Sequence, residues 1–179
     1  MSNNEMRLIL AGFGGQGLLF GGKVIAYAGL IEDREVSWLP SYGPEMRGGT
    51  ANCSVTLSDE PIGSPLVTDP TAVIAMNQPS VDKFGPTIVP GGVIVIDSAL
   101  TNTPPDRDDI KVFMIPATEI AEKAGFKVLA NMVCLGKLWK ETGFCDEASL
   151  EPALRHAVPA KHADMIDKNL EALRLGMTL

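Results

Sequence analysis

Two glycine-rich segments near the start of the chain carry the residue types that could do chemistry. Residues 12–17 read Gly-Phe-Gly-Gly-Gln-Gly and match the G-x-G-x-x-G spacing of dinucleotide-binding turns. In such turns, backbone N–H groups and the start of the next helix hold a phosphate. A phosphate-bearing ligand is one expectation, and a tight turn that only allows close helix–strand packing is the other. The candidate cofactor-binding residues are Gly14, Gly15, Gln16 and Gly17.

The second half of an NAD-binding fingerprint is missing. In that fingerprint, an acidic residue about 20 positions further on ends the second strand and binds the ribose hydroxyls. Here the second expected strand ends in Trp38-Leu39-Pro40, and Glu35 stands at its opposite end. Binding of NAD(P) is therefore disfavoured, although a free-standing NAD(P)-binding oxidoreductase stays open as an alternative.

The second glycine-rich segment places an aromatic ring, a carboxylate and a guanidinium between Tyr42 and Arg47. Its glycines and proline predict a loop. We expect this loop at the carboxyl edge of a sheet, where ligands and partners dock in open α/β folds. The alternative is a solvated surface loop. The candidate partner or substrate-access residues are Tyr42, Gly43, Pro44, Glu45, Arg47, Gly48 and Gly49.

No other residues form a recognisable catalytic or metal-binding pattern. The cysteines are widely spaced, without a C-x-x-C pair, so we expect plain thiols and no cluster or disulfide. The two histidines stand six positions apart, on different faces of any one helix, and are expected on the surface or at helix ends. We expect no bound metal. These residues are Cys53, Cys134, Cys145, His156 and His162.

Asp97 is the one carboxylate at the end of a strong predicted strand. Active-site residues often stand at this position, but an aspartate also caps the turn that follows a strand, and we favour the cap. The sequence contains no G-x-S-x-G elbow and no nucleophile–base–acid set. A self-sufficient hydrolase is therefore disfavoured.

The elements that position these segments alternate between strands and helices. Residues 50–57 alternate apolar and polar side chains, which predicts a half-exposed strand, antiparallel and at an edge of the sheet. We predict an α/β fold, a three-layer Rossmann-like sandwich whose mostly parallel sheet has helices on both faces. The predicted strands are 7–11, 35–39, 50–57, 71–76, 93–96 and 111–115, and the predicted helices are 18–31, 79–84, 116–123, 131–141, 147–156 and 162–175.

Length and charge limit the classes of protein further. The 179 residues suit one domain, spanning 1–179. With 15 Lys and Arg against 22 Asp and Glu, the net charge of -7 would repel a phosphate backbone, so we expect no nucleic-acid partner. No leader peptide and no apolar run of membrane-spanning length is evident. We therefore expect a cytoplasmic protein with no membrane partner.

Taken together, three segments resemble the gamma subunit of 2-oxoacid:ferredoxin oxidoreductases of the 2-oxoglutarate and pyruvate types. They are residues 11–17, the Ser-Tyr-Gly-Pro-Glu-Met-Arg-Gly-Gly-Thr segment at 41–50, and the helix start at Asn131-Met132-Val133. The first segment is shared by many nucleotide-binding folds, whereas the second is specific. The resemblance covers nearly the whole chain and is closest to the separate small subunit of the 2-oxoglutarate type.

The resemblance implies a subunit that is inactive alone. In that family, the complex decarboxylates a 2-oxoacid to an acyl-CoA and passes two electrons to ferredoxin. Thiamine diphosphate, Mg and iron–sulfur clusters are implied on alpha and beta subunits or on a ferredoxin-like delta subunit. The resemblance implies that this chain binds none of them and helps to bring in coenzyme A. Its glycine turn would lie at the edge of the sheet, with Tyr42, Glu45 and Arg47 turned toward the catalytic partner. A non-catalytic binding module stays open as an alternative.

Overall fold

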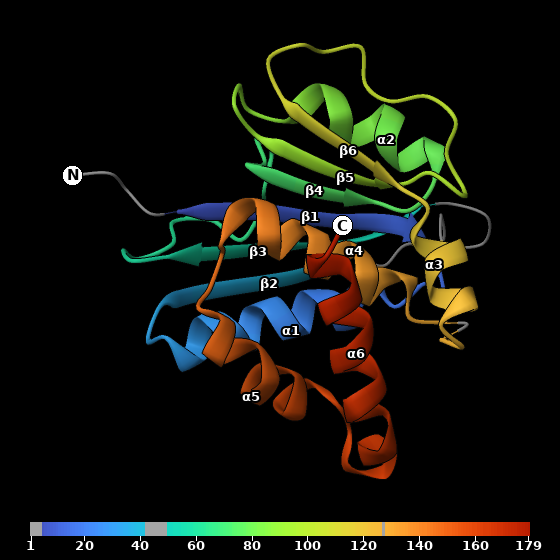
Figure 1. Cartoon of the computed structure of the whole chain (residues 1–179). Coiled ribbons are helices and arrows are strands. Elements are labelled where there is room, and N and C mark those ends of the chain that lie inside the picture. The colour runs from blue at the N-terminus through green and yellow to red at the C-terminus, as the bar shows by residue number, and fades with distance from the viewer. Residues whose placement is uncertain (1–4, 42–49, 127) are drawn as a thin grey trace.

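The computed structural model describes residues 5–41, 50–126 and 128–179. Its strands are β1 (Met6–Phe13), β2 (Glu35–Ser41), β3 (Thr50–Ser58), β4 (Ala72–Ala75), β5 (Val93–Asp97) and β6 (Lys111–Ile115). They form one six-stranded sheet in the order β2-β3-β1-β4-β5-β6 (Figure 1). β3 is antiparallel to β1 and β2, whereas the three pairs from β1 to β6 are parallel. The prediction of a mostly parallel sheet is confirmed.

Helices cover both faces of this sheet, so the predicted three-layer α/β sandwich is also confirmed (Figure 1). One face packs against α1 (Leu18–Ile31), α3 (Ala117–Lys123) and α4 (Ala130–Thr142), while α5 (Glu147–Ala157) and α6 (Ile166–Met177) pack against α1 and α4. The other face packs against α2 (Gln78–Phe84), which the short 3-10 helix η2 (Gly85–Thr87) follows directly. Two apolar clusters, one on each face, form the core.

The strand at residues 50–58 is antiparallel, as predicted, but it does not lie at the edge of the sheet. β3 is inserted between β1 and β2, and β2 is the edge strand. The alternation has a different cause: Cys53 and Val55 pack against the α1 side, whereas Asn52 and Ser54 are only partly buried on the opposite face. One covered and one open face produce the same pattern as an edge position.

The last predicted helix begins later than its sequence pattern indicates. Residues Ala160–Met165 form the 3-10 helix η3, in which His162 has a φ of -120° that departs from helical geometry. Its N–H donates to the Pro159 carbonyl three residues back, at 2.8 Å. The regular helix α6 therefore starts at Ile166. The other predicted helices match within a residue or two at each end.

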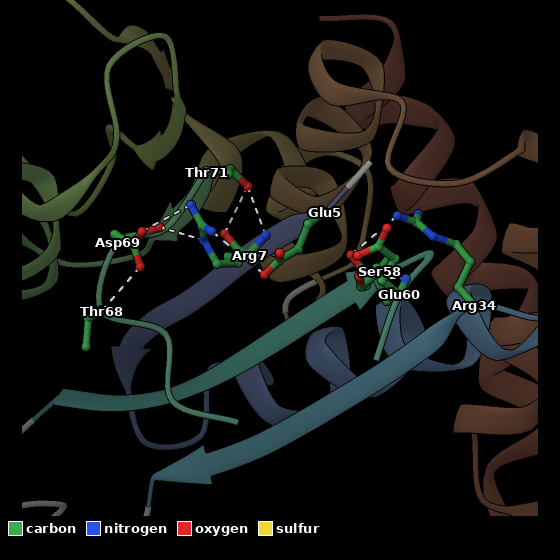
Figure 2. Close-up of polar contacts among 9 residues, drawn as sticks. Glu5, Arg7, Arg34, Ser58, Glu60, Thr68, Asp69 and Thr71 are labelled. Carbon is green, nitrogen blue, oxygen red and sulfur yellow. Dashed lines mark hydrogen bonds and ion pairs between the residues drawn. The ribbon is translucent and has the colours of Figure 1, made fainter. Parts of the chain in front are cut away.

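Charged side chains at the amino edge of the sheet hold the connection from β3 to β4 (Figure 2). Arg7 donates from Nε to the Asp69 carbonyl at 2.9 Å, and its Nη2 lies 3.2 Å from the Asp69 carboxylate. The Thr71 hydroxyl donates to the Arg7 carbonyl and accepts from the Arg7 N–H. Arg34 forms an ion pair with Asp59 at 3.2 Å. These contacts all lie at the amino edge of the sheet, whereas the candidate site lies at the carboxyl edge.

Within the parts of the chain that the structure describes, no helix is long and apolar enough to cross a membrane. The cytoplasmic location stays a prediction.

Candidate functional site

The glycine turn lies between β1 and α1, at the carboxyl edge of the sheet, as the sequence predicts (Figure 1). Gly15 has a φ of 90° and Gly17 a φ of 74°, in the left-handed region that a side chain disfavours. Space is open around the positions that a Cβ would take at Gly14 and Gly15. The turn therefore presents backbone, without side chains, to whatever lies beyond the edge.

The helix that follows the turn has an uncapped start. Gly17, the N-cap residue of this 14-residue helix, has no side chain to accept a hydrogen bond from the first N–H groups of α1. The first turn carries no acidic residue. Free N–H groups at such a helix start favour an oxygen acceptor from a ligand.

Gln16 folds back over the turn. Its Oε1 accepts a hydrogen bond from the Phe13 N–H at 2.6 Å, and its Nε2 donates to the Met76 carbonyl at 3.3 Å. A Cβ at Gly12 would lie 2.3 Å from Oε1, so Gly12 leaves the space that the carboxamide fills. The side chain therefore joins the turn after β1 to the end of β4.

Asn131 also belongs to the site, although the sequence does not identify it as a site residue. It lies in the first turn of α4, and its Nδ2 donates to the Gly17 carbonyl at 2.9 Å, across 114 positions of sequence. A Cβ at Gly17 would lie 2.6 Å from this Nδ2. The Oδ1 atom is buried and accepts no hydrogen bond from any described residue. The starts of α1 and α4 thus meet, with one amide oxygen left for a donor.

β3 brings the two glycine-rich segments together. Its first residue, Thr50, pairs with Phe13, and Ala51 pairs with Gly12. On the other side of the second segment, Ser41 ends β2 and pairs with Asn52. Ser41 and Thr50, the described residues that flank residues 42–49, therefore lie at the carboxyl edge, and Thr50 lies beside the glycine turn. The predicted loop residues lie outside the described residues: Tyr42, Gly43, Pro44, Glu45, Arg47, Gly48 and Gly49.

A pocket of about 340 Å³ opens against the glycine turn. Gly14, Gly15 and Gly17 supply its backbone part, and the remaining lining is apolar and uncharged. The lining side chains are Phe13, Leu18, Leu19, Phe20 and Ala51. Ligand pockets of this kind combine an apolar wall with a few polar groups that fix orientation. The pocket suits a flexible arm with an apolar surface and an oxygen acceptor.

Asp97 is a structural cap, as the sequence favours. Its buried carboxylate accepts hydrogen bonds from the Ala99 N–H at 3.1 Å and from the Thr118 N–H at 3.3 Å. The Thr118 hydroxyl donates to the other carboxylate oxygen at 2.5 Å. These hydrogen bonds hold the turn after β5 and the start of α3, so the Asp97 carboxylate has a structural role.

The cysteines are buried free thiols, as predicted. Burial raises the pKa of the Cys53 and Cys145 thiols to about 12, and it raises the pKa of the Cys134 thiol as well. Such thiols stay protonated at neutral pH and are poor nucleophiles and ligands. Both histidines are exposed, and His156 stacks on Tyr27 at 5.6 Å between ring centroids. No group of three or more candidate metal ligands occurs among residues 5–41, 50–126 and 128–179.

The sequence is similar to those of other proteins. The pyruvate ferredoxin/flavodoxin oxidoreductase family model matches residues 7–179. Ketoisovalerate oxidoreductase subunit VorA from Methanothermobacter thermautotrophicus is 42% identical over 96% of the chain, which spans only 36% of that relative. The 2-oxoglutarate synthase subunit KorC from Methanocaldococcus jannaschii is 36% identical over 93% of the chain and 89% of its own length.

Solved structures show the same fold. The gamma subunit of a keto/oxoacid ferredoxin oxidoreductase from Geobacter sulfurreducens matches 97% of the chain and 96% of its own, with a TM-score of 0.82 and 28% identity. The 2-oxoglutarate:ferredoxin oxidoreductase from Magnetococcus marinus, solved with 2-oxoglutarate, coenzyme A and succinyl-CoA, matches over 97% of the chain and 30% of its own, with a TM-score of 0.84 and 26% identity. The chain therefore belongs to the pyruvate ferredoxin/flavodoxin oxidoreductase family and is related to its gamma-type subunits.

Proposed function

We propose that this chain is the gamma subunit of a 2-oxoacid:ferredoxin oxidoreductase and brings coenzyme A to the reaction. In that reaction the bond between C1 and C2 of the 2-oxoacid breaks, CO₂ leaves, and C2 forms a thioester with coenzyme A. Two electrons pass, one at a time, to two ferredoxins. Alpha and beta subunits, with a possible ferredoxin-like delta subunit, would carry the thiamine diphosphate, Mg and clusters that the reaction needs.

The observation that carries this proposal is that the glycine turn lies at the same edge of the sheet as Ser41 and Thr50, which flank the second glycine-rich segment. Pairing of Phe13 with Thr50 places the end of the second segment next to the turn and its pocket. The uncapped start of α1 offers N–H donors there. Phe13, which lines this pocket, exposes 44% of its surface.

The described residues do not fit the other cofactors of such a complex. They bring no three metal ligands together, and all three cysteines are buried and separate. This chain would therefore hold coenzyme A in part and leave the redox groups to its partners.

2-Oxoglutarate is the proposed substrate, because KorC and the Magnetococcus marinus enzyme are named for it. The higher identity to VorA favours a branched-chain 2-oxoacid as the second candidate. The glycine turn and its pocket face coenzyme A in either reaction, so the choice between these acids rests with the partner subunits.

The proposal predicts stoichiometric partners and no activity in their absence. Affinity purification of the tagged chain from its own cells, followed by native mass spectrometry, should recover alpha and beta subunits in equal number. The purified complex should reduce ferredoxin only when both a 2-oxoacid and coenzyme A are present, whereas the chain alone should reduce none. Recovery of the chain without partners, or 2-oxoacid-dependent dye reduction by the chain alone, would contradict the proposal.

The competing NAD(P) function predicts a different ligand. Glu35 starts β2 at the amino edge, and the described end of that strand is Leu39-Pro40-Ser41, without a carboxylate for ribose. We therefore expect NADH not to bind the purified chain with useful affinity. Calorimetry with NADH, run beside coenzyme A, tests this. A micromolar dissociation constant for NADH, worth roughly -8 kcal/mol, would restore the dehydrogenase alternative.

A further inference from the structure

Gln16 is the only side chain of the glycine turn that can form hydrogen bonds, and it uses them within the protein. Its acceptor atom takes the Phe13 N–H, and one of its donors reaches the Met76 carbonyl. Phe13 is the last residue of β1, and Met76 directly follows β4. The carboxamide therefore ties the turn to the neighbouring parallel strand.

This tie determines which part of the turn remains open. The carboxamide fills the space beside Gly12 and occupies the Phe13 N–H, so this N–H is not free to bind a ligand. Gly14 and Gly15 stay exposed, and beyond their chain neighbours no atom of a described residue lies within 4 Å of the positions that a Cβ would take there. The backbone beyond Gln16 then enters α1 through Gly17.

We propose that Gln16 is a positioning residue of the coenzyme A site, which holds the glycine turn in the shape that presents Gly14 and Gly15 to the ligand. The proposal rests on the function proposed above and adds the role of this side chain. In this role the carboxamide acts through the turn: its Oε1 accepts from the Phe13 N–H, and one Nε2 hydrogen reaches the Met76 carbonyl.

Two variants separate positioning from direct contact. Gln16→Met keeps the length of the side chain and removes both hydrogen bonds. Gln16→Glu keeps the acceptor for the Phe13 N–H, loses the donor to Met76 and adds a negative charge. A positioning role predicts that Gln16→Glu retains more coenzyme A affinity than Gln16→Met. A direct contact with the anionic coenzyme A predicts the opposite order, since a carboxylate would repel its phosphates.

Gln78 provides a matched control at the same edge of the sheet. Its Oε1 accepts from the N–H groups of Asn102 and Thr103, and its Nε2 donates to Asp82 and to the Thr103 carbonyl. Gln78→Met therefore removes at least as many hydrogen bonds as Gln16→Met, away from the glycine turn. It should lower thermal stability without changing the KM for coenzyme A.

The measurement is steady-state turnover of the assembled complex, with the KM for coenzyme A and for the 2-oxoacid determined separately, together with the melting temperature of each variant. We expect Gln16→Met to lower kcat/KM for coenzyme A by about 10- to 100-fold, the effect of misplacing a site by a fraction of an ångström to one ångström. The KM for the 2-oxoacid should stay unchanged. If Gln16→Met does not assemble, the same ratio is measured on Gln16→Glu, with an expected loss of kcat/KM for coenzyme A smaller than 10-fold but above that of Gln78→Met.

Two results overturn the inference alone: an unchanged kcat/KM for coenzyme A in both Gln16 variants, or a larger loss of kcat/KM in Gln16→Glu than in Gln16→Met. A wild-type complex whose turnover does not depend on coenzyme A overturns the proposed function, and the inference falls with it.

Discussion

Replacement of Gly136 by alanine should destabilise the chain by about 3 kcal/mol, at the upper end of the usual cost of overpacking. Gly136 lies where α4 crosses α6, and a Cβ there would sit 1.9 Å from the Leu173 carbonyl oxygen. Across the same crossing, a Cβ at Gly176 would sit 2.0 Å from the Val133 carbonyl oxygen. Both obstructing atoms are backbone, so only separation of the two helices makes room.

The test is whether Gly136→Ala lowers or raises the stability of the chain. In a helix without such a contact, a change from glycine to alanine stabilises by up to about 1 kcal/mol. Urea unfolding of the purified chain should instead show a lower midpoint for Gly136→Ala. Gly63→Ala is the control, since no atom lies within 4 Å of the position of its Cβ and its φ is not in the left-handed region. A midpoint for Gly136→Ala equal to or above that of the wild type would contradict the close crossing of α4 and α6.

Arg47→Ala should abolish most of the coenzyme-A-dependent turnover of the assembled complex and leave the folding of the chain unchanged. Arg47 belongs to the second glycine-rich segment, which is flanked by Ser41 and Thr50 at the carboxyl edge of the sheet. A guanidinium offers a planar fork of donors suited to a carboxylate or phosphate. Truncation of a buried charge contact across an interface costs roughly 2–5 kcal/mol, and the lower value corresponds to a loss of about 30-fold.

The alternative for Arg47 is a solvated side chain, which predicts an effect within about 0.5 kcal/mol. Turnover of complexes reconstituted with wild-type and Arg47→Ala chains distinguishes the two, with thermal melts of each chain alone as a measure of folding. Arg155→Ala is the matched control, because Arg155 forms an exposed ion pair with Glu151 within α5. Unchanged turnover and assembly in Arg47→Ala would make the second segment ordinary surface.

Local patterns in the sequence determined the elements and the class of fold. Buried parallel strands were predicted from the β-branched run at 93–96 and from the apolar runs at 7–11 and 71–76. Such continuous apolar runs arise because these strands are covered on both faces. The G-x-G-x-x-G spacing placed the turn between a strand and a helix, and the structure confirms it. The specific Tyr-Gly-Pro-Glu-x-Arg-Gly-Gly segment indicated the family, which the comparisons confirm. Each of these signals depends on residues close together in the chain.

Only the tertiary structure decided how these elements meet. The alternation at 50–57 indicates only that one face of the strand is open. Whether such a strand lies at the edge of the sheet or next to the edge strand depends on which strands pair with it. The bond from Asn131 to Gly17 spans 114 positions, and the crossing at Gly136 and Gly176 joins α4 to α6, which α5 separates in the chain. Strand pairing and helix crossing are set by contacts between distant segments, whose energies no local pattern records. The candidate site is built from such contacts, and for this reason the sequence identified the glycine turn but neither Asn131 nor the contact that joins it to Gly17.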